Sequence, residues 1–239
     1  MEELAERVWR LRGWPPNAVN VYVVGTALVD AGTERAKRRI LREVRGVSLD
    51  THVVTHAHPD HFGSSHSICT ELTLPLWTGS RDADALERGR PVSASRLLNR
   101  LPAPAGHPVS RRLREGDEVA GFYVLDVPGH SPGHIALWRE HDRALLCGDV
   151  FFNFPRLGAP PRLLTVDPVR NRESMRRLAG LRPALVLFGH GPPSPRPGAA
   201  RSGGVAEPQR RMISTRRPNE LGSAYSMTKR AATWPCIEE

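Results

Sequence analysis

Three histidines and one aspartate fall within the six residues from His56 to His61, directly after a short apolar segment. Imidazole nitrogens and carboxylate oxygens are the ligands that borderline divalent metals such as zinc prefer. In a turn that leaves the end of a strand, His56 and His58 can face one way while Asp60 and His61 turn toward a neighbouring point. This segment therefore predicts a metal site, either one crowded site or two adjacent ones.

The composition is that of a globular protein with a core of its own. The chain has 239 residues, of which 39% are hydrophobic, and its mean hydropathy is −0.39. This length fits one α/β domain, with or without an appendage. No apolar run approaches the roughly 20 residues that span a bilayer, and the acidic N-terminus is unlike a secretory signal. Because three scattered cysteines make no disulfide framework, we expect a cytoplasmic protein with no membrane partner.

The net charge of +9 does not predict a nucleic-acid partner. Residues 194–239 carry +4 of it, as 8 Lys+Arg against 4 Asp+Glu, and residues 1–193 carry the remaining +5. Arginine supplies nearly all of the positive charge, because Lys37 and Lys229 are the only lysines. The basic runs are not interleaved with the aromatic residues that stack single-stranded bases. We therefore expect no nucleic-acid partner.

Hydrophobic periodicity predicts strands and helices in an order typical of an α/β fold. Ala36, Ile40 and Val44 recur every four residues, which predicts an amphipathic helix that begins near Thr33. An Asp-Pro pair predicts the start of another helix over residues 168–179. Short helices are expected over 63–69 and 80–87, with a loop or a short helix pair over 91–108. The predicted strands are residues 6–14, 19–24, 27–30, 51–55, 74–77, 119–127, 135–138, 144–147 and 184–188.

Four of the predicted strands end in a metal-competent side chain beside glycine or proline. After the cluster at 56–61 come His130 in Pro-Gly-His-Ser-Pro-Gly-His, Asp149 after Cys-Gly, and His190 in Gly-His-Gly-Pro. Ligands converge at strand ends along one edge of the sheet in α/β proteins. A glycine beside a ligand lets the backbone approach closely and turn sharply. Together these four places predict one composite metal site.

With these motifs in this order, residues 5–193 resemble the metallo-β-lactamase-fold superfamily of metallohydrolases, in particular its glyoxalase II-like and lactonase-like members. The resemblance implies an α/β fold built as a four-layer αββα sandwich, in which two mixed β-sheets are flanked by helices. It also implies a hydrolase domain over residues 1–193. Residues 194–239 lack sustained periodicity and are rich in proline and glycine, so we expect an irregular, disordered tail there.

The resemblance implies a centre of two metal ions, with zinc as the expected metal and iron or manganese as alternatives. One metal would be held by His56, His58 and His130, and the other by Asp60, His61 and His190. Asp149 would bridge the two, and a hydroxide shared by the metals would attack an acyl carbon. Asp60 would also orient the nucleophile and pass a proton to the leaving group.

Four further residues are candidates for supporting or pocket positions. Asp30 ends an early strand and corresponds to a family-like acidic residue near the floor of the site. His134 lies four residues after His130, and we expect it to support the site rather than to bind the metal. Phe151 and Phe152 follow Asp149 closely and are expected either to line an apolar pocket or to serve as ordinary core aromatics.

The expected substrate is a small thioester or lactone, which leaves a small-molecule acyl compound as the expected partner. The tail is too short and too irregular for the C-terminal helical domain of glyoxalase II, and the ligand run with Asp60 is less like that of a β-lactamase. Two alternatives remain open: a mononuclear iron enzyme of the persulfide dioxygenase type, and a non-catalytic or damaged member of the fold. The second arises because the family-like pattern stops just after His190.

Overall fold

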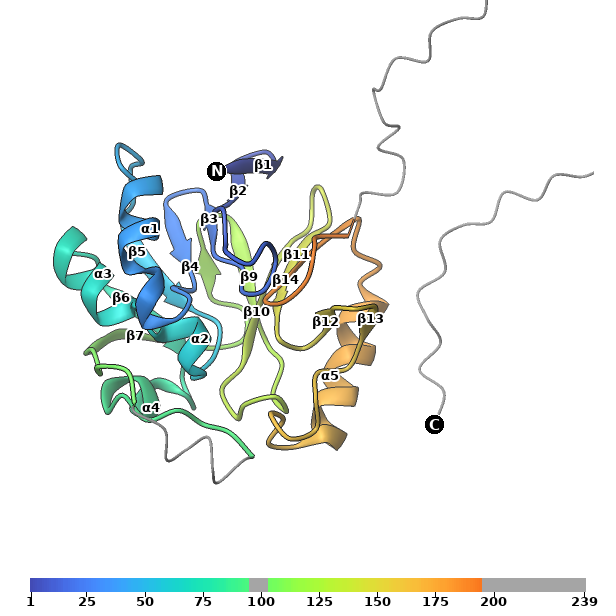
Figure 1. The fold of residues 1–239 in the computed structure, drawn as a ribbon. Coiled ribbons are helices and arrows are strands. Elements are labelled where there is room, and N and C mark those ends of the chain that lie inside the picture. Colours follow the sequence, from blue (N-terminus) through green and yellow to red (C-terminus); the bar gives the residue numbers. More distant parts are fainter. Residues whose placement is uncertain (95–102, 195–239) are drawn as a thin grey trace, which may run out of the picture. The chain divides into compact units, whose positions relative to one another are not determined.

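The computed structural model describes residues 1–94 and 103–194, and Figure 1 shows the arrangement of their helices and strands. The predicted tail lies outside these residues except for Ser194. That residue pairs with the last strand, because its main-chain N–H donates to the Val186 carbonyl at 3.0 Å. In the described ranges, no helix combines the length and the hydrophobicity that crossing a membrane requires.

The first sheet of the described residues contains seven strands in sequence order. They are β1 (Glu2–Ala5), β2 (Val8–Arg10), β3 (Tyr22–Val24), β4 (Ala27–Val29), β5 (Thr51–Val54), β6 (Leu76–Gly79) and β7 (Val109–Leu113). Neighbours from β1 to β4 are antiparallel and those from β4 to β7 are parallel, so the sheet is mixed. Parallel pairs need long crossovers, and these contain the helices η1 (Glu34–Ala36), α1 (Lys37–Glu43), α2 (Pro59–Phe62), α3 (Ser65–Leu72) and α4 (Ala83–Glu87).

The second sheet has the strand order β14-β11-β10-β9-β8 in the part of the chain that the structure describes. Its strands are β8 (Glu118–Val119), β9 (Phe122–Asp126), β10 (Ile135–Arg139), β11 (Ala144–Gly148) and β14 (Leu185–Phe188). The pair β11–β14 is parallel and the other pairs are antiparallel. Helix α5 (Pro168–Gly180) is the crossover between β11 and β14, and the Asp167 side chain caps it by accepting from two main-chain N–H groups.

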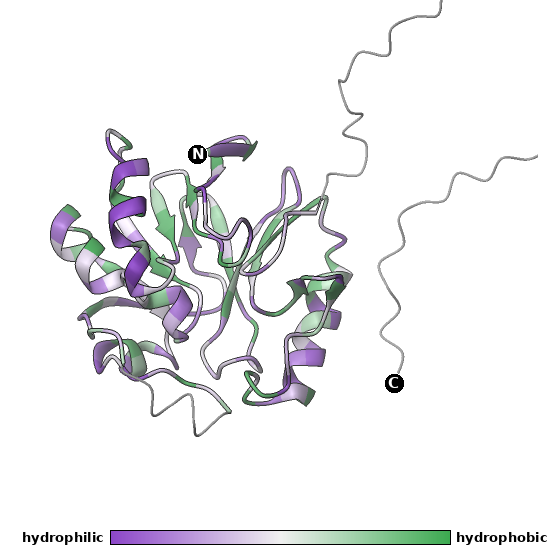
Figure 2. Ribbon diagram, viewed as in Figure 1, coloured by the Kyte–Doolittle hydropathy of each residue, from purple (hydrophilic) through white to green (hydrophobic). Residues whose placement is uncertain are grey.

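The main core lies between the two sheets. Val24, Val29 and Val53 of the first sheet are fully buried against Val124 and Leu137 of the second. Two further clusters fix helices to the outer face of the first sheet, one around α1 and one around α3 and α4. Figure 2 shows the apolar strands between helices with hydrophilic outer surfaces. The predicted four-layer αββα sandwich of two mixed sheets is confirmed.

Several element boundaries differ from the sequence-based prediction. The single strand predicted over 6–14 is wrong, because the chain reverses at Arg7, whose φ is 55°, and forms the hairpin of β1 and β2. Strand β7 was not predicted, because its three central residues are exposed and polar and so give no apolar pattern. The two-residue strands β12 (Phe152–Asn153) and β13 (Leu157–Gly158) were not predicted either. In 91–94 and 103–108 there is neither helix nor strand, and the rest of that predicted loop lies outside the described residues.

Candidate metal centre

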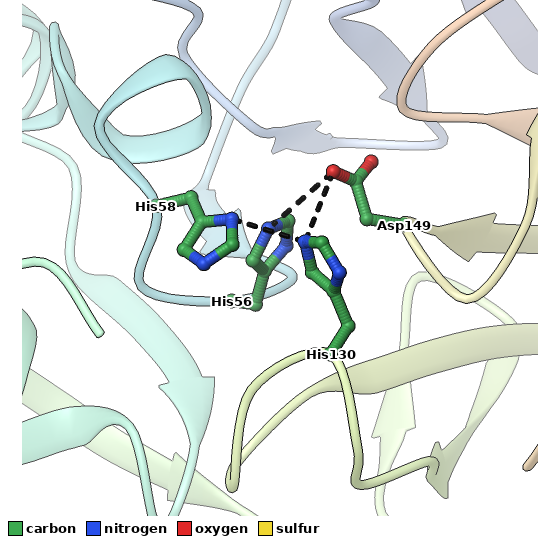
Figure 3. A group of neighbouring side chains, drawn as sticks. All are labelled: His56, His58, His130 and Asp149. Carbon is green, nitrogen blue, oxygen red and sulfur yellow. Dashed lines mark hydrogen bonds and ion pairs between the residues drawn. The ribbon is translucent and has the colours of Figure 1, made fainter. Parts of the chain in front are cut away.

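The seven predicted ligands come together at the edge where the strands of both sheets end, and they form two groups. The first group consists of His56, His58, His130 and Asp149, whose ligand atoms all lie within 4.8 Å of one another. Figure 3 shows the three imidazole rings and the carboxylate converging from three separate loops. These loops follow β5, β9 and β11, and all four residues are buried.

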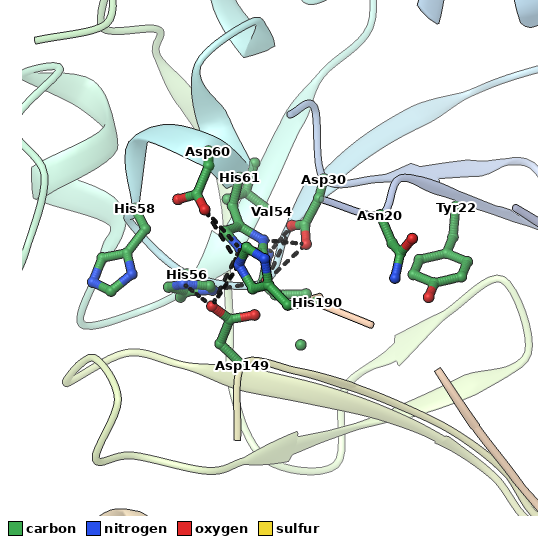
Figure 4. A network of polar contacts seen from close by, with 12 residues as sticks. Asn20, Tyr22, Asp30, Val54, His56, His58, Asp60, His61, Asp149 and His190 are labelled. Carbon is green, nitrogen blue, oxygen red and sulfur yellow. Dashed lines mark hydrogen bonds and ion pairs between the residues drawn. The ribbon is translucent and has the colours of Figure 1, made fainter. Parts of the chain in front are cut away.

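The second group consists of Asp60, His61 and His190, whose ligand atoms also lie within 4.8 Å of one another. The first two residues belong to the short helix α2, which begins at Pro59 immediately after the His58 loop, and the third follows β14. This group is more open than the first, because the Asp60 and His190 side chains are 33% and 16% exposed. Figure 4 shows the group beside Asp149.

One oxygen atom joins the two groups. Asp149 Oδ2 lies 3.7 and 3.3 Å from the Nε2 atoms of His56 and His130 in the first group. The same oxygen lies 3.4 and 3.2 Å from the Nε2 atoms of His61 and His190 in the second. A carboxylate surrounded by four imidazole nitrogens from two groups has the position of a bridging ligand.

In three ligand rings Nδ1 has a hydrogen-bond partner, which turns Nε2 toward the centre. His56 Nδ1 lies 3.0 Å from the Thr55 hydroxyl, and His130 Nδ1 lies 3.3 Å from the Thr165 hydroxyl. His190 Nδ1 bonds the Ala18 carbonyl. A proton held on Nδ1 by such an acceptor leaves Nε2 as a free lone pair, which is the tautomer a metal requires.

Asp30 supports one histidine of each group. Its carboxylate lies 2.8 Å from His61 Nδ1, and it also accepts the hydroxyl hydrogen of Thr55, whose oxygen in turn faces His56. The Thr55 main-chain N–H donates to the same carboxylate at 2.8 Å. The prediction that Asp30 lies near the floor of the site matches this placement.

The residues present fit a divalent metal. His56 Nε2 and Asp149 Oδ1 are buried and have no hydrogen-bond partner among the described residues. Such atoms cost free energy unless something satisfies them. His58 faces the centre with Nδ1, which lies 3.0 Å from His130 Nε2. His58 Nδ1 and His130 Nε2 therefore point at one small volume, and at least one of them has a free lone pair. Such a pair of nitrogens is typical of a cation site.

Two histidines of the first group, His56 and His58, are held neutral. Burial lowers the pKa of His56 well below its usual range, and the neighbouring His61 and His58 lower it further. Burial, followed by the nearby His130, lowers the pKa of His58 to about 3. Neutral imidazole is the form that binds a metal, so these two ligands are ready to do so at neutral pH.

In the second group the carboxylates dominate. Burial alone would lower the pKa of His190, but Asp149 and Asp60 outweigh burial and raise it to about 10. The same balance, with Asp149 as the largest charge, raises the pKa of His61 well above its usual range. The pKa of Asp60 falls to about 2, because His61 and His190 outweigh the effect of burial. Without a metal, this group therefore carries protons at neutral pH.

Asp82 was not among the predicted site residues. It is a buried carboxylate that accepts hydrogen bonds from two ligand loops. It accepts the main-chain N–H of Ala57, between His56 and His58, at 2.9 Å. It also accepts the Gly133 N–H at 2.7 Å and the Ser131 hydroxyl, both in the loop that carries His130. The only sequence signal was its position just before α4, which looks like an ordinary helix cap. Asp82 belongs to the support of the first group.

The sequence analysis also missed Asn20 and Tyr22, which hold the loop that carries His190. The Asn20 carboxamide donates to the carbonyls of Phe188 and Gly191 at 2.9 and 2.7 Å. The Tyr22 hydroxyl donates to the same Phe188 carbonyl at 2.8 Å. A Cβ atom at Gly189 would overlap Asp149 Oδ1, which explains the glycine before His190. His190 is thus firmly positioned, although the family-like sequence pattern ends just after it.

The remaining candidates are placed as follows. His134 stacks on His56 with 4.6 Å between ring centroids, and its Nε2 accepts the Asp149 main-chain N–H at 3.0 Å, so this nitrogen is directed at the backbone. Phe152 lines a pocket of about 290 Å³ that opens onto Asp60, Asp149 and His190. Phe151 is buried and is not among the residues that line this pocket.

Comparisons with known proteins agree with this geometry. Residues 14–190 match the family model described as the metallo-beta-lactamase superfamily. The chain is 31% identical over 198 residues to the "Probable metallo-hydrolase YflN" of Bacillus subtilis (strain 168), covering 70% of this chain and 75% of that protein. It is 34% identical over 114 residues to the hydroxyacylglutathione hydrolase of Methylococcus capsulatus, which covers 46% of this chain and 37% of that enzyme. The solved structure of "TTHA1623 in a di-iron-bound form" has a TM-score of 0.60 and 30% identity, covering 77% of this chain and 92% of that one.

The chain therefore belongs to the metallo-β-lactamase superfamily, as its motifs predicted. It is a metal-dependent hydrolase of that fold. The matched region extends to residue 190 and so includes all seven predicted ligands. The family and the His/Asp site define the class of enzyme.

Proposed function

We propose that this protein is a dinuclear, zinc-dependent hydrolase that cleaves the acyl bond of a small thioester or lactone. The observation that carries the proposal is the position of Asp149 Oδ2, within 3.7 Å of a histidine nitrogen from each of four ligands in two groups. A bridging carboxylate between two ligand groups is the arrangement that a pair of divalent ions needs. The match to a hydroxyacylglutathione hydrolase, a thioesterase by name, supports the acyl chemistry.

A bound pair of divalent ions would supply an acidified water molecule and a Lewis acid for the acyl oxygen. The residues of the chain do the rest. Asp60 lines the pocket and stays ionised at neutral pH, since its pKa is lowered to about 2. Its Oδ2 lies 3.2 Å from His190 Nε2, so the carboxylate is fixed at the boundary between the centre and the pocket. From there it orients the attacking water by accepting a hydrogen bond from it. It takes the proton that this water loses as its oxygen bonds to the acyl carbon, and it passes that proton to the leaving group as the acyl bond breaks.

The proposal includes the setting of the reaction. The substrate is a small-molecule acyl compound, the enzyme acts in the cytoplasm, and neither nucleic acid nor a membrane is a partner. Seven ligands in two groups favour two metals over the single iron of a persulfide dioxygenase. Iron remains the chemical alternative to zinc, because one similar protein was crystallised in a di-iron-bound form.

Metal analysis of the purified protein, combined with a substrate panel, tests the proposal. We expect about two zinc ions per chain, with turnover of thioesters or lactones that exceeds turnover of β-lactams and phosphodiesters. Asp60→Ala should lower the turnover by at least about a hundredfold. Asp50→Ala removes an exposed carboxylate at the other end of β5 from the ligand loop and should leave the turnover unchanged. One iron per chain with oxygen consumption on a persulfide, or equal turnover by Asp60→Ala, would contradict the proposal.

A further inference from the structure

The pocket beside the metal centre is lined both by metal ligands and by apolar side chains. Ten described residues line it, and its polar part consists of four ligands and two hydroxyl residues: His58, Asp60, Asp149, His190, Thr33 and Ser93. Phe152 and Leu164 belong to the apolar part, together with two prolines. None of these ten lining residues is a lysine or an arginine. At about 290 Å³ the pocket lies at the small end of the range for ligand sites.

Phe152 is fixed against both ligand groups. Its ring centroid lies 4.5 Å from that of His190 and 6.3 Å from that of His130. The strand β12 that carries it pairs with β13, and the next residue, Asn153, donates its main-chain N–H to the His190 carbonyl at 2.9 Å. The aromatic wall is therefore attached to the same loop as a ligand of the second group.

Leu164 is attached to the first group in a similar way. Its main-chain N–H donates to the Pro161 carbonyl at 3.0 Å, which makes a turn of this loop. The next residue, Thr165, faces His130 Nδ1 at 3.3 Å, and the Val166 N–H donates to the His130 carbonyl at 3.2 Å. The segments that carry these two apolar side chains are thus bonded to ligand loops, one to a loop of each group.

We propose that Phe152 and Leu164 make the enzyme selective for an uncharged, apolar acyl group of a few carbon atoms. This inference rests on the proposed function, since it names the acyl group of the same reaction. An apolar chain gains free energy for each methylene that it buries against these walls. A carboxylate at the far end of the acyl group would lose its hydration against Phe152 and Leu164, with no lysine or arginine among the described lining residues to replace it.

Thioesters of one neutral thiol, N-acetylcysteamine, test the inference. The acyl groups are acetyl, butanoyl and succinyl, of which the last two share a four-carbon backbone and differ in charge. We expect kcat/KM for the butanoyl ester to exceed that for the acetyl ester by about 15-fold, or roughly fourfold per methylene. We expect kcat/KM for the succinyl ester to fall at least about tenfold below the butanoyl value.

Variants of Phe152 and Leu164 test whether these two residues cause the preference for the butanoyl ester. Leu164→Ala and Phe152→Ala should each reduce the butanoyl-to-acetyl ratio to about fourfold or less, with the metal content of the protein unchanged. Leu163→Ala is the matched control, because Leu163 lies in the same loop, is 66% exposed and does not line the pocket. An equal drop of the ratio in this control would overturn the assignment to Leu164.

A binding measurement separates this inference from the proposed function. Acetohydroxamic and butanohydroxamic acid have the same uncharged metal-binding head, and calorimetry gives their Kd values without any turnover. We expect the longer acid to bind about 15-fold more tightly to the metal-loaded protein. If no thioester or lactone is cleaved, the proposed function fails, while this series still reports on the pocket. Equal Kd values, equal kcat/KM for acetyl and butanoyl esters, or a preference for the succinyl ester would overturn the inference.

Discussion

The two ligand groups differ in burial and in the residues that support them. The first group is fully buried, whereas Asp60 and His190 of the second group are 33% and 16% exposed. Side chains hold the first group, through Asp82 and Thr165. The second group is held by the Ala18 carbonyl on His190, by the Asn20 side chain on the loop around His190, and by Asp30 on His61.

Because of this difference, we expect the two groups to have different roles in metal binding and catalysis. A buried, rigidly supported group is preorganised and binds its metal without rearrangement. The open group faces the pocket, where substrate and the attacking water must enter. We therefore expect the first group to bind metal more tightly and the second to exchange it more readily.

The largest expected effect comes from Asp149, the residue that both groups share. Asp149→Ala should reduce the metal content from about two ions per chain to fewer than one, and should lower turnover by at least about a thousandfold. Metal content is measured by mass spectrometry of the dialysed protein. If the variant kept one tightly bound ion, Asp149 would serve only one group and the comparison would need revision.

Asp82→Ala should weaken the first group selectively. The substitution leaves three buried donors of two loops without an acceptor, so we expect the free energy of unfolding to fall by about 3 kcal/mol or more. The affinity for the first metal should fall about 10–100-fold. Urea denaturation and a chelator competition measure these two quantities. Asp84→Ala, in the helix that follows and with an exposed ion pair to Arg112, is the control and should change neither.

Asn20→Ala should weaken the second group selectively. It removes the two hydrogen bonds that hold the loop on either side of His190, at a cost of about 2 kcal/mol in the free energy of unfolding. We expect the second metal to bind about tenfold more weakly and the first to bind as before. Tyr22→Phe removes only one of two donors to the Phe188 carbonyl and should have a smaller effect. Equal weakening of both metals would contradict the division of support.

The smallest expected effect is a difference in proton release. In the metal-free protein His61 and His190 carry protons at pH 7, because the pKa of each is raised, that of His190 to about 10. His56 and His58 are neutral there, because the pKa of each is lowered. Filling both sites at pH 7 should therefore release at least about two protons, one each from His61 and His190, and raising the pH should favour the loaded state. A pH indicator in weak buffer measures the release, and a value near zero would refute this assignment.

The metal site was largely predictable from the chain, because its ligands carry local signals. His56, His58, Asp60 and His61 share one short segment, and the other three ligands each follow an apolar strand beside glycine. The alternation of strands and helices likewise predicted the α/β sandwich. Strand boundaries were less predictable where the signal is short or polar. The strands β12 and β13 have two residues each, and β7 exposes its arginines at the edge of the first sheet.

The supporting residues could not be predicted, since each acts across a long separation in sequence. Asn20 bonds a carbonyl 168 residues away, and Asp82 bonds loops 25 and 51 residues away. An asparagine before a strand and an aspartate before a short helix have ordinary local explanations. Nothing in the pattern distinguishes them from turn or cap residues.

The sequence by itself determined the chemistry of this protein: which side chains can bind a metal, and that they follow strands that meet at one sheet edge. The resemblance implied how these ligands divide and that Asp149 bridges them, while the tertiary structure gave their distances, the distant residues that hold them and the apolar side chains that line the pocket. The physical reason is that donor type and periodicity are properties of short segments. Distances between loops, and the pKa shifts that follow from burial and neighbouring charge, exist only once the two sheets have packed together.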